Sequence, residues 1–153
     1  MKSFFDPERV AWREVVGETE LPYKVQHEYA ILGHDVAAGT LDMVLRWRGD
    51  GGHCPMHRHV GTTSVLVLEG EQNTWDLNPD GSLGKHTVRQ AGEYALNLGD
   101  GPPHLERGGD AGAIVFFGGH SNAGILYELI DPEMNMIAEV TIDSLVSDWK
   151  AHT

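Results

Sequence analysis

The chain has 153 residues, of which 41% are hydrophobic, and 23 acidic against 11 basic side chains give it a formal charge of −12. This length and apolar content predict one domain, residues 1–153, with a substantial core. The negative charge would repel phosphate backbones and anionic lipids, so we expect neither a nucleic-acid nor a membrane partner. The sequence has no long apolar segment and no signal peptide, and its one cysteine, Cys54, cannot form an internal disulfide, so we expect a cytoplasmic protein.

Short, mostly alternating apolar segments separated by turn residues run along most of the chain. After a loose N-terminal arm, they predict strands at residues 10–16, 25–32, 40–47, 65–68, 71–77, 86–90, 94–98, 105–107, 113–118, 124–130 and 136–142. The segment 143–152 is expected to be helical, with Asp143 as N-cap and Leu145, Val146 and Trp149 at helical spacing. This order predicts an all-β sandwich or jelly roll that ends in a short helix.

The first stretch that carries chemistry runs from Gly51 to Gly70 and contains His57-Arg58-His59. Residues two apart on a strand point to the same face, so both imidazoles can reach one point in space. Neutral imidazole is the commonest metal ligand in proteins, and two side by side form half a site. We expect the apolar run after the histidines to be a buried strand that a turn at Gly70 closes.

A second stretch runs from Gly92 to Gly108. A strand pattern leads into a turn rich in glycine and proline, residues 99–103, and His104 follows where a new strand should start. His104 lies 45 residues after His59 and is the candidate third ligand.

Together the two stretches resemble the cupin superfamily over about residues 40–130. The first cupin motif is matched at Gly51, His57, His59 and Gly70, and the second at Gly92, Gly101 and His104 with one extra residue and displaced prolines. The resemblance implies an RmlC-like jelly roll, the double-stranded β-helix of a single-domain cupin. Its core would be about 40–130, with an N-terminal arm and strands at 1–39 and a C-terminal strand and helix at 131–153.

The sequence departs from the motif at two positions. The cupin glutamate falls on Thr63 or, with a gap one residue longer, on Ser64, and the asparagine that closes the second motif is replaced by Gly108. Without that glutamate, three neutral imidazoles would leave the charge of a divalent ion uncompensated. Such a site would favour an anionic bidentate substrate, for example an enolate.

Within the cupins, the chain resembles three-histidine iron dioxygenases of the acetylacetone-cleaving and dihydroxyacetophenone-cleaving type, in length and in the segment after residue 124. This resemblance implies a mononuclear non-haem iron(II) site at His57, His59 and His104 and cleavage of a C–C bond in a small β-diketone or hydroxyketone. Imidazole ligands also suit Zn, Ni, Mn or Cu, so the metal stays open. The alternative is a metal-binding sensor module of the ChrR-like cupin branch without turnover, and a metal-free barrel like the sugar-nucleotide epimerases is a third.

The remaining histidines have weaker claims to a role. His120 follows a predicted buried strand and is a second-shell candidate together with Thr63 and Ser64, whereas His53 and His86 are expected on the surface. His27, His34 and His152 have no neighbouring partners in the sequence, and Cys54 is expected to be a bystander. We also expect a homodimer, because most homo-oligomers are two-fold dimers.

Overall fold

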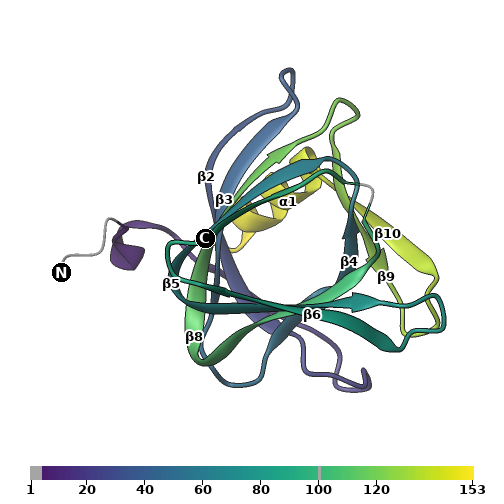
Figure 1. Cartoon of the computed structure of the whole chain (residues 1–153). Helices are drawn as coiled ribbons and strands as arrows, with labels where there is room; N and C mark the ends of the chain where they lie inside the picture. Colours follow the sequence, from purple (N-terminus) through teal and green to yellow (C-terminus); the bar gives the residue numbers. More distant parts are fainter. Residues whose placement is uncertain (1–4, 100) are drawn as a thin grey trace.

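The computed structural model describes residues 5–99 and 101–153, and in these residues ten strands form one sheet that curls into an open barrel (Figure 1). A 3₁₀ turn, η1 (Pro7–Arg9), precedes the strands and one helix, α1 (Ile142–Ala151), follows them. The strands are β1 (Arg13–Val16), β2 (Gln26–Asp35), β3 (Thr40–Trp47), β4 (His53–His59), β5 (Thr62–Leu77), β6 (Leu83–Gln90), β7 (Tyr94–Asn97), β8 (His104–His120), β9 (Ile125–Ile130) and β10 (Met136–Thr141). The prediction of an all-β jelly roll with a short C-terminal helix is confirmed.

Strand β8 is the centre of the sheet. The strand order is β1-β2-β3-β8-β4-β9-β10, and β5 joins this path by pairing with β8 and also pairs with β6 and β7. The C-terminal half of β8 lies between β3 and β5, whereas its first residues lie between β4 and the end of β5. All these pairs are antiparallel, so alternate side chains of β8 enter the barrel.

Two predicted turns are wrong, and glycine explains the first. The predicted strands at 65–68 and 71–77 are one strand, β5, whose register shifts on both sides of a bulge around Gly70. Gly70 has a φ of +72°, and a Cβ there would lie 2.2 Å from the carbonyl oxygen of Gly112. Only glycine fits such a close approach, so the strand bends and continues. Likewise, the predicted strands at 105–107 and 113–118 are parts of β8.

The main core fills the barrel between β2, β3, β5 and β8. Buried aliphatic and aromatic side chains from these strands meet there, among them Leu41, Val67, Val115 and Phe117. A smaller cluster consists of Met56 from β4, Leu77 from β5 and Ile130 from β9.

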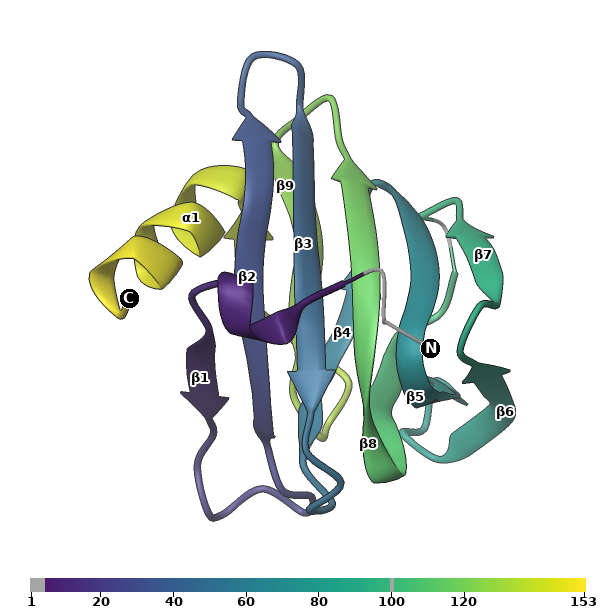
Figure 2. The same cartoon turned by 90° about the vertical axis from the view of Figure 1, so that its left-hand side faces the viewer.

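Helix α1 lies beside β2, on the side of the molecule away from β6 and β7 (Figure 2). Its buried residues Ile142, Leu145 and Val146 belong to the main core. The N-cap is Thr141 rather than the predicted Asp143, because the side chains of Thr141 and Ser144 each bond the other's backbone N–H in a capping box. No helix among the described residues is long and apolar enough to cross a membrane.

Candidate metal centre

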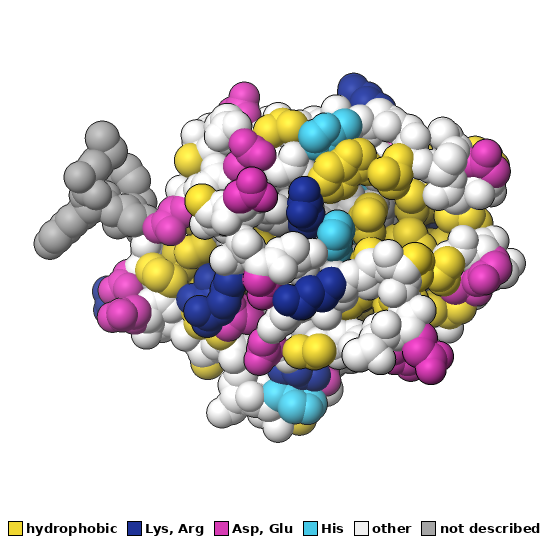
Figure 3. All heavy atoms as spheres, turned by 90° about the horizontal axis from the view of Figure 1, so that it is seen from below, with side chains coloured by type: hydrophobic (Ala, Val, Ile, Leu, Met, Phe, Trp, Pro, Cys, Tyr) yellow, Lys and Arg dark blue, Asp and Glu magenta, His cyan; other side chains and the backbone are white. Residues whose placement is uncertain are grey.

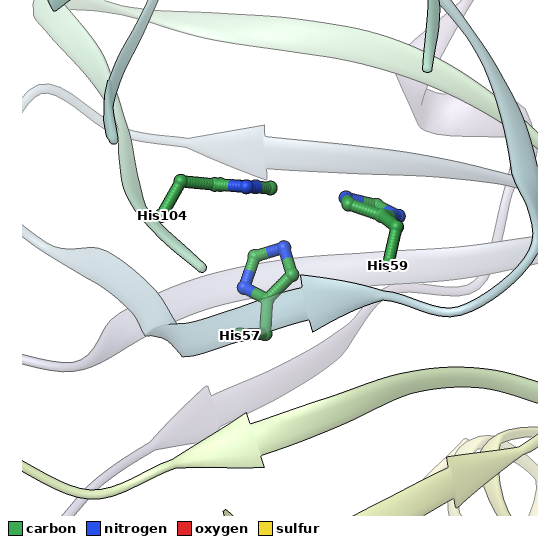
Figure 4. Close-up of side chains that lie close together, drawn as sticks. All are labelled: His57, His59 and His104. Carbon is green, nitrogen blue, oxygen red and sulfur yellow. The ribbon is translucent and has the colours of Figure 1, made fainter. Parts of the chain in front are cut away.

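Two strands bring three histidines to one point inside the barrel. His57 and His59 lie two apart at the end of β4, and His104 begins β8, where it pairs directly with His57. One ring nitrogen from each lies within 4.8 Å of the others, and all three rings point to a common centre (Figure 4). The three residues are buried, with exposed fractions of 7, 9 and 8%.

Hydrogen bonds hold two of the rings in the orientation that a ligand needs. Nδ1 of His57 lies 2.7 Å from the carbonyl oxygen of Pro55. A carbonyl oxygen only accepts, so Nδ1 carries the proton and Nε2 keeps its lone pair for the centre. Nδ1 of His59 lies 3.1 Å from the hydroxyl of Thr63, and this contact orients the ring of His59.

The contact from Thr63 also bears on the register of the first cupin motif. Thr63 is 6% exposed and faces the site, whereas the next side chain, Ser64, points to the other face of β5. Of the two candidates for the motif's glutamate position, Thr63 is therefore the one that faces the site, and its contact there is with His59.

A carboxylate that the sequence analysis missed lies beside the histidines. Oε1 of Glu106 is 3.8 Å from Nε2 of His57 and 4.0 Å from Nε2 of His104, and Glu106 is 2% exposed. Its other oxygen, Oε2, accepts a hydrogen bond from the side-chain amide of Gln72. The strand period could have found it, because Glu106 follows His104 by two residues and so shares its face. The expectation of a site without a carboxylate is thus not met.

Burial sets the electrostatics of the site. It lowers the pKa of His57, lowers that of His59 to about 3 with a further contribution from His57, and lowers that of His104 well below its usual range. Burial also raises the pKa of Glu106 to about 7, against the hydrogen bond from Gln72 and the charge of Arg89. The imidazoles are therefore neutral near pH 7, the form that binds metal.

These residues fit a divalent transition metal. Neutral imidazoles are ligands for Fe, Zn, Cu and Ni, and a carboxylate widens the set to Mn. The ring nitrogens of the three histidines converge on one point, and the buried Oε1 of Glu106 lies 3.8 Å from Nε2 of His57.

The centre lies between two cavities. Both are lined by His59, Glu106 and Phe117. The first, which we call the apolar cavity, has a volume of about 320 Å³ and extends toward α1, with Met43, Leu45, Leu129 and Leu145 in its wall. The second, the polar cavity, has a volume of about 440 Å³ and includes Lys85, Arg89, Thr87 and Asn97 in its wall. On the face drawn in Figure 3, histidine and basic side chains lie beside a gathering of hydrophobic ones.

His27 also belongs to this region, although no partner for it was visible in the sequence. It lines the apolar cavity, and its buried Nδ1 has no hydrogen-bond partner among the described residues. Burial and the nearby His57 lower its pKa to about 4. Its neighbours come from β4, so the sequence offers no signal for this placement.

The other candidates lie elsewhere. His120 ends β8, at the opposite end from His104, and is exposed. His53 begins β4 and its ring packs edge-on against Tyr23, whereas His86 is exposed and stacks on Trp75. Cys54 lines the apolar cavity, and burial raises the pKa of its thiol well above the usual value, as expected for a bystander.

Comparison with known proteins places the fold. No family model matches the sequence, and no curated protein matches it. Solved structures do match. An RmlC-like cupin protein from Ralstonia eutropha JMP134 superposes with a TM-score of 0.69 at 17% identity, covering 95% of this chain and 83% of that one. The chain has the cupin fold.

Two further matching structures are described by an enzyme activity or by iron. An acetylacetone dioxygenase from Acinetobacter johnsonii matches with a TM-score of 0.64 at 14% identity, covering 92% of this chain and 87% of that one. The iron(II) form of HppE matches with a TM-score of 0.54 at 16% identity, covering 75% of this chain and 58% of that one.

Proposed function

We propose that the protein is a mononuclear non-haem iron dioxygenase that cleaves a C–C bond of a small β-diketone or hydroxyketone. The observation that carries the proposal is the convergence of His57, His59 and His104 on one buried point that opens into two cavities. The likeness in fold to an acetylacetone dioxygenase and to the iron(II) form of HppE supports this proposal. Iron(II) is the proposed metal, held by these three histidines.

The chain's residues would contribute orientation and exclusion of water. When bound, the metal would supply open coordination positions for substrate oxygens and dioxygen. Thr63 and the Pro55 carbonyl hold the rings of His59 and His57, and the largely hydrophobic wall of the apolar cavity would keep water from the reacting carbon atoms. Insertion of both atoms of dioxygen across one C–C bond of a β-diketone gives a carboxylic acid and an α-ketoaldehyde, and no other reductant is needed.

The polar cavity favours a substrate with an anionic or enolic oxygen. Lys85 and Arg89 line it, and among the described residues neither forms an ion pair, although the chain carries 23 acidic side chains. A guanidinium that forms no ion pair is suited to hold an oxygen anion. The remainder of the substrate would extend into the apolar cavity.

Oxygen uptake tests the proposal. Purified protein loaded with iron(II) is expected to consume one dioxygen per molecule of a β-diketone in a panel that also contains hydroxyketones, with both atoms of ¹⁸O₂ found in the products. Protein that binds the metal tightly but consumes no oxygen with any member of the panel would favour the sensor alternative.

We further propose a cytoplasmic homodimer with a small molecule as its substrate. Exposed hydrophobic side chains on β6, β7 and β10, such as Leu83, Tyr94 and Ile137, offer surface for a second copy. Sedimentation at micromolar concentration is expected to give twice the chain mass, and a monomer would contradict this part.

A further inference from the structure

We propose that Glu106 is a ligand of the metal, so that this chain supplies a carboxylate from β8 in place of the glutamate missing at Thr63. The inference rests on the metal-binding part of the proposed function and is independent of the reaction.

The position of Glu106 follows from strand geometry. His104 and Glu106 are two apart on β8, and the neighbouring strand β4 pairs His57 with His104 and Cys54 with Glu106. The carboxylate therefore enters the barrel on the same face as the histidine, one step further along the strand. Its Oε1 lies 3.8 Å from Nε2 of His57 and 4.0 Å from Nε2 of His104. Glu106 is not part of the group of three histidines whose ligand atoms all lie within 4.8 Å of one another, so it approaches the centre from the side of His57 and His104.

The atoms that face each other are both acceptors. The proton of His57 lies on Nδ1, where it is donated to the Pro55 carbonyl, so Nε2 presents a lone pair to Oε1 of Glu106. At 3.8 Å the two atoms are too far apart to share a proton in a hydrogen bond, so a group placed between them would have to bind both lone pairs. A divalent ion at the centre is such a group.

Among the described residues, Glu106 forms no ion pair with an arginine or a lysine. Glu28, a second buried carboxylate, is 8% exposed and accepts hydrogen bonds from the guanidinium groups of both Arg46 and Arg48. Glu106 is more deeply buried, yet among the described residues its ion-pair partners are only His57 and His104. Burying a carboxylate without a counterion is costly, and such carboxylates are paired or bind metals.

A series of side-chain hydrogen bonds holds the carboxylate of Glu106 in its orientation. Arg89 donates to Oε1 of Gln72 at 3.4 Å, and Gln72 in turn donates its amide N–H to Oε2 of Glu106. This holds one carboxylate oxygen and leaves the other for the centre, as outer partners of metal-binding carboxylates do.

The test compares metal affinities in the full chain after removal of metal. Carboxylate ligands matter more for Mn(II) than for Cu(II), which imidazoles bind well by themselves. We expect Glu106→Gln, which keeps the shape and an acceptor for Gln72, to weaken Mn(II) binding on the order of 100-fold and Cu(II) binding much less. Glu106→Asp keeps the charge but shortens the side chain. Its affinity for Mn(II) is expected to be roughly 10-fold lower than that of wild type, and its affinity for Cu(II) unchanged.

A matched control separates ligation from support. Thr63→Val removes the hydrogen bond to His59 and is expected to weaken both metals to a similar extent. Wild-type Mn(II) affinity in both Glu106 variants, or equal losses for Mn(II) and Cu(II) in Glu106→Gln, would overturn the proposal. The measured quantity is metal affinity. A protein that shows the expected metal preferences but no oxygen uptake would therefore contradict the proposed dioxygenase activity and still support ligation by Glu106.

Discussion

The buried carboxylate of Glu106 makes a prediction about the protein without its metal. Burial raises the pKa of Glu106 from 4.5 to about 7. A group whose pKa is raised on folding contributes stability that is fully present below its unfolded pKa and is lost as the pH rises through its folded pKa. Metal-free wild type therefore carries a penalty at pH 8 that it does not carry at pH 4.5.

The size of the penalty follows from the shift. A difference of about 2.5 pKa units corresponds to about 3 kcal/mol, of which about 2 kcal/mol develops between pH 5.5 and pH 8. Glutamine at position 106 does not titrate. Because both proteins contain the same histidines, the difference in their free energies of unfolding isolates this carboxyl group. The free energy of unfolding of Glu106→Gln, measured relative to that of wild type, should therefore rise by about 2 kcal/mol between pH 5.5 and pH 8.

Urea unfolding of chelator-treated protein at the two pH values measures this difference. Glu128→Gln is the control, because Glu128 is only partly buried and pairs with Arg58, and such pairs contribute about 0–1 kcal/mol. A difference between Glu106→Gln and wild type that does not change with pH would refute the reasoning. With saturating Mn(II) the order should reverse, and wild type should be the more stable protein.

Three further predictions concern the histidines and the motif. Replacing any one histidine of the cluster by alanine should abolish tight metal binding in a metal analysis, whereas His86→Ala should leave the metal content unchanged. Burial lowers the pKa of His27 to about 4 and that of His59 to about 3, so the stability of the metal-free protein is full above pH 6.5 and falls as the pH drops, by up to about 1.4 kcal/mol per pH unit for each histidine. The urea midpoint of metal-free His27→Phe should therefore fall less steeply with decreasing pH than that of wild type, and an equally steep fall would exclude His27 as a contributor. Thr63→Glu, which faces the site, should retain metal more tightly and consume oxygen more slowly than wild type in a chelator challenge and an oxygen electrode, whereas the outward Ser64→Glu should match wild type; equal behaviour of the two variants would contradict the assigned register.

Much of the fold and the histidine cluster could be predicted from the sequence, because the relevant signals are local. The alternation of apolar residues and the turn residues between them predicts strands, and residues 40–47 form a strand with the predicted bounds. His57 and His59 are two apart, so the strand period alone places both on one face. The spacing of Gly51 and Gly70 around them indicates the cupin motif, and the structure gives both glycines positive φ.

What only the tertiary structure decided depends on pairings between distant strands. Whether Gly70 ends a strand or bends it depends on the approach of Gly112, which lies 42 residues away along the chain. His27 reaches the cavity because β2 and β4 enclose the same space, and no local pattern reports which faces meet. Glu106 illustrates both kinds of information. Its position two residues after His104 was visible in the sequence, whereas its burial and its place beside Nε2 of His57 exist only once β4, β5 and β8 are paired.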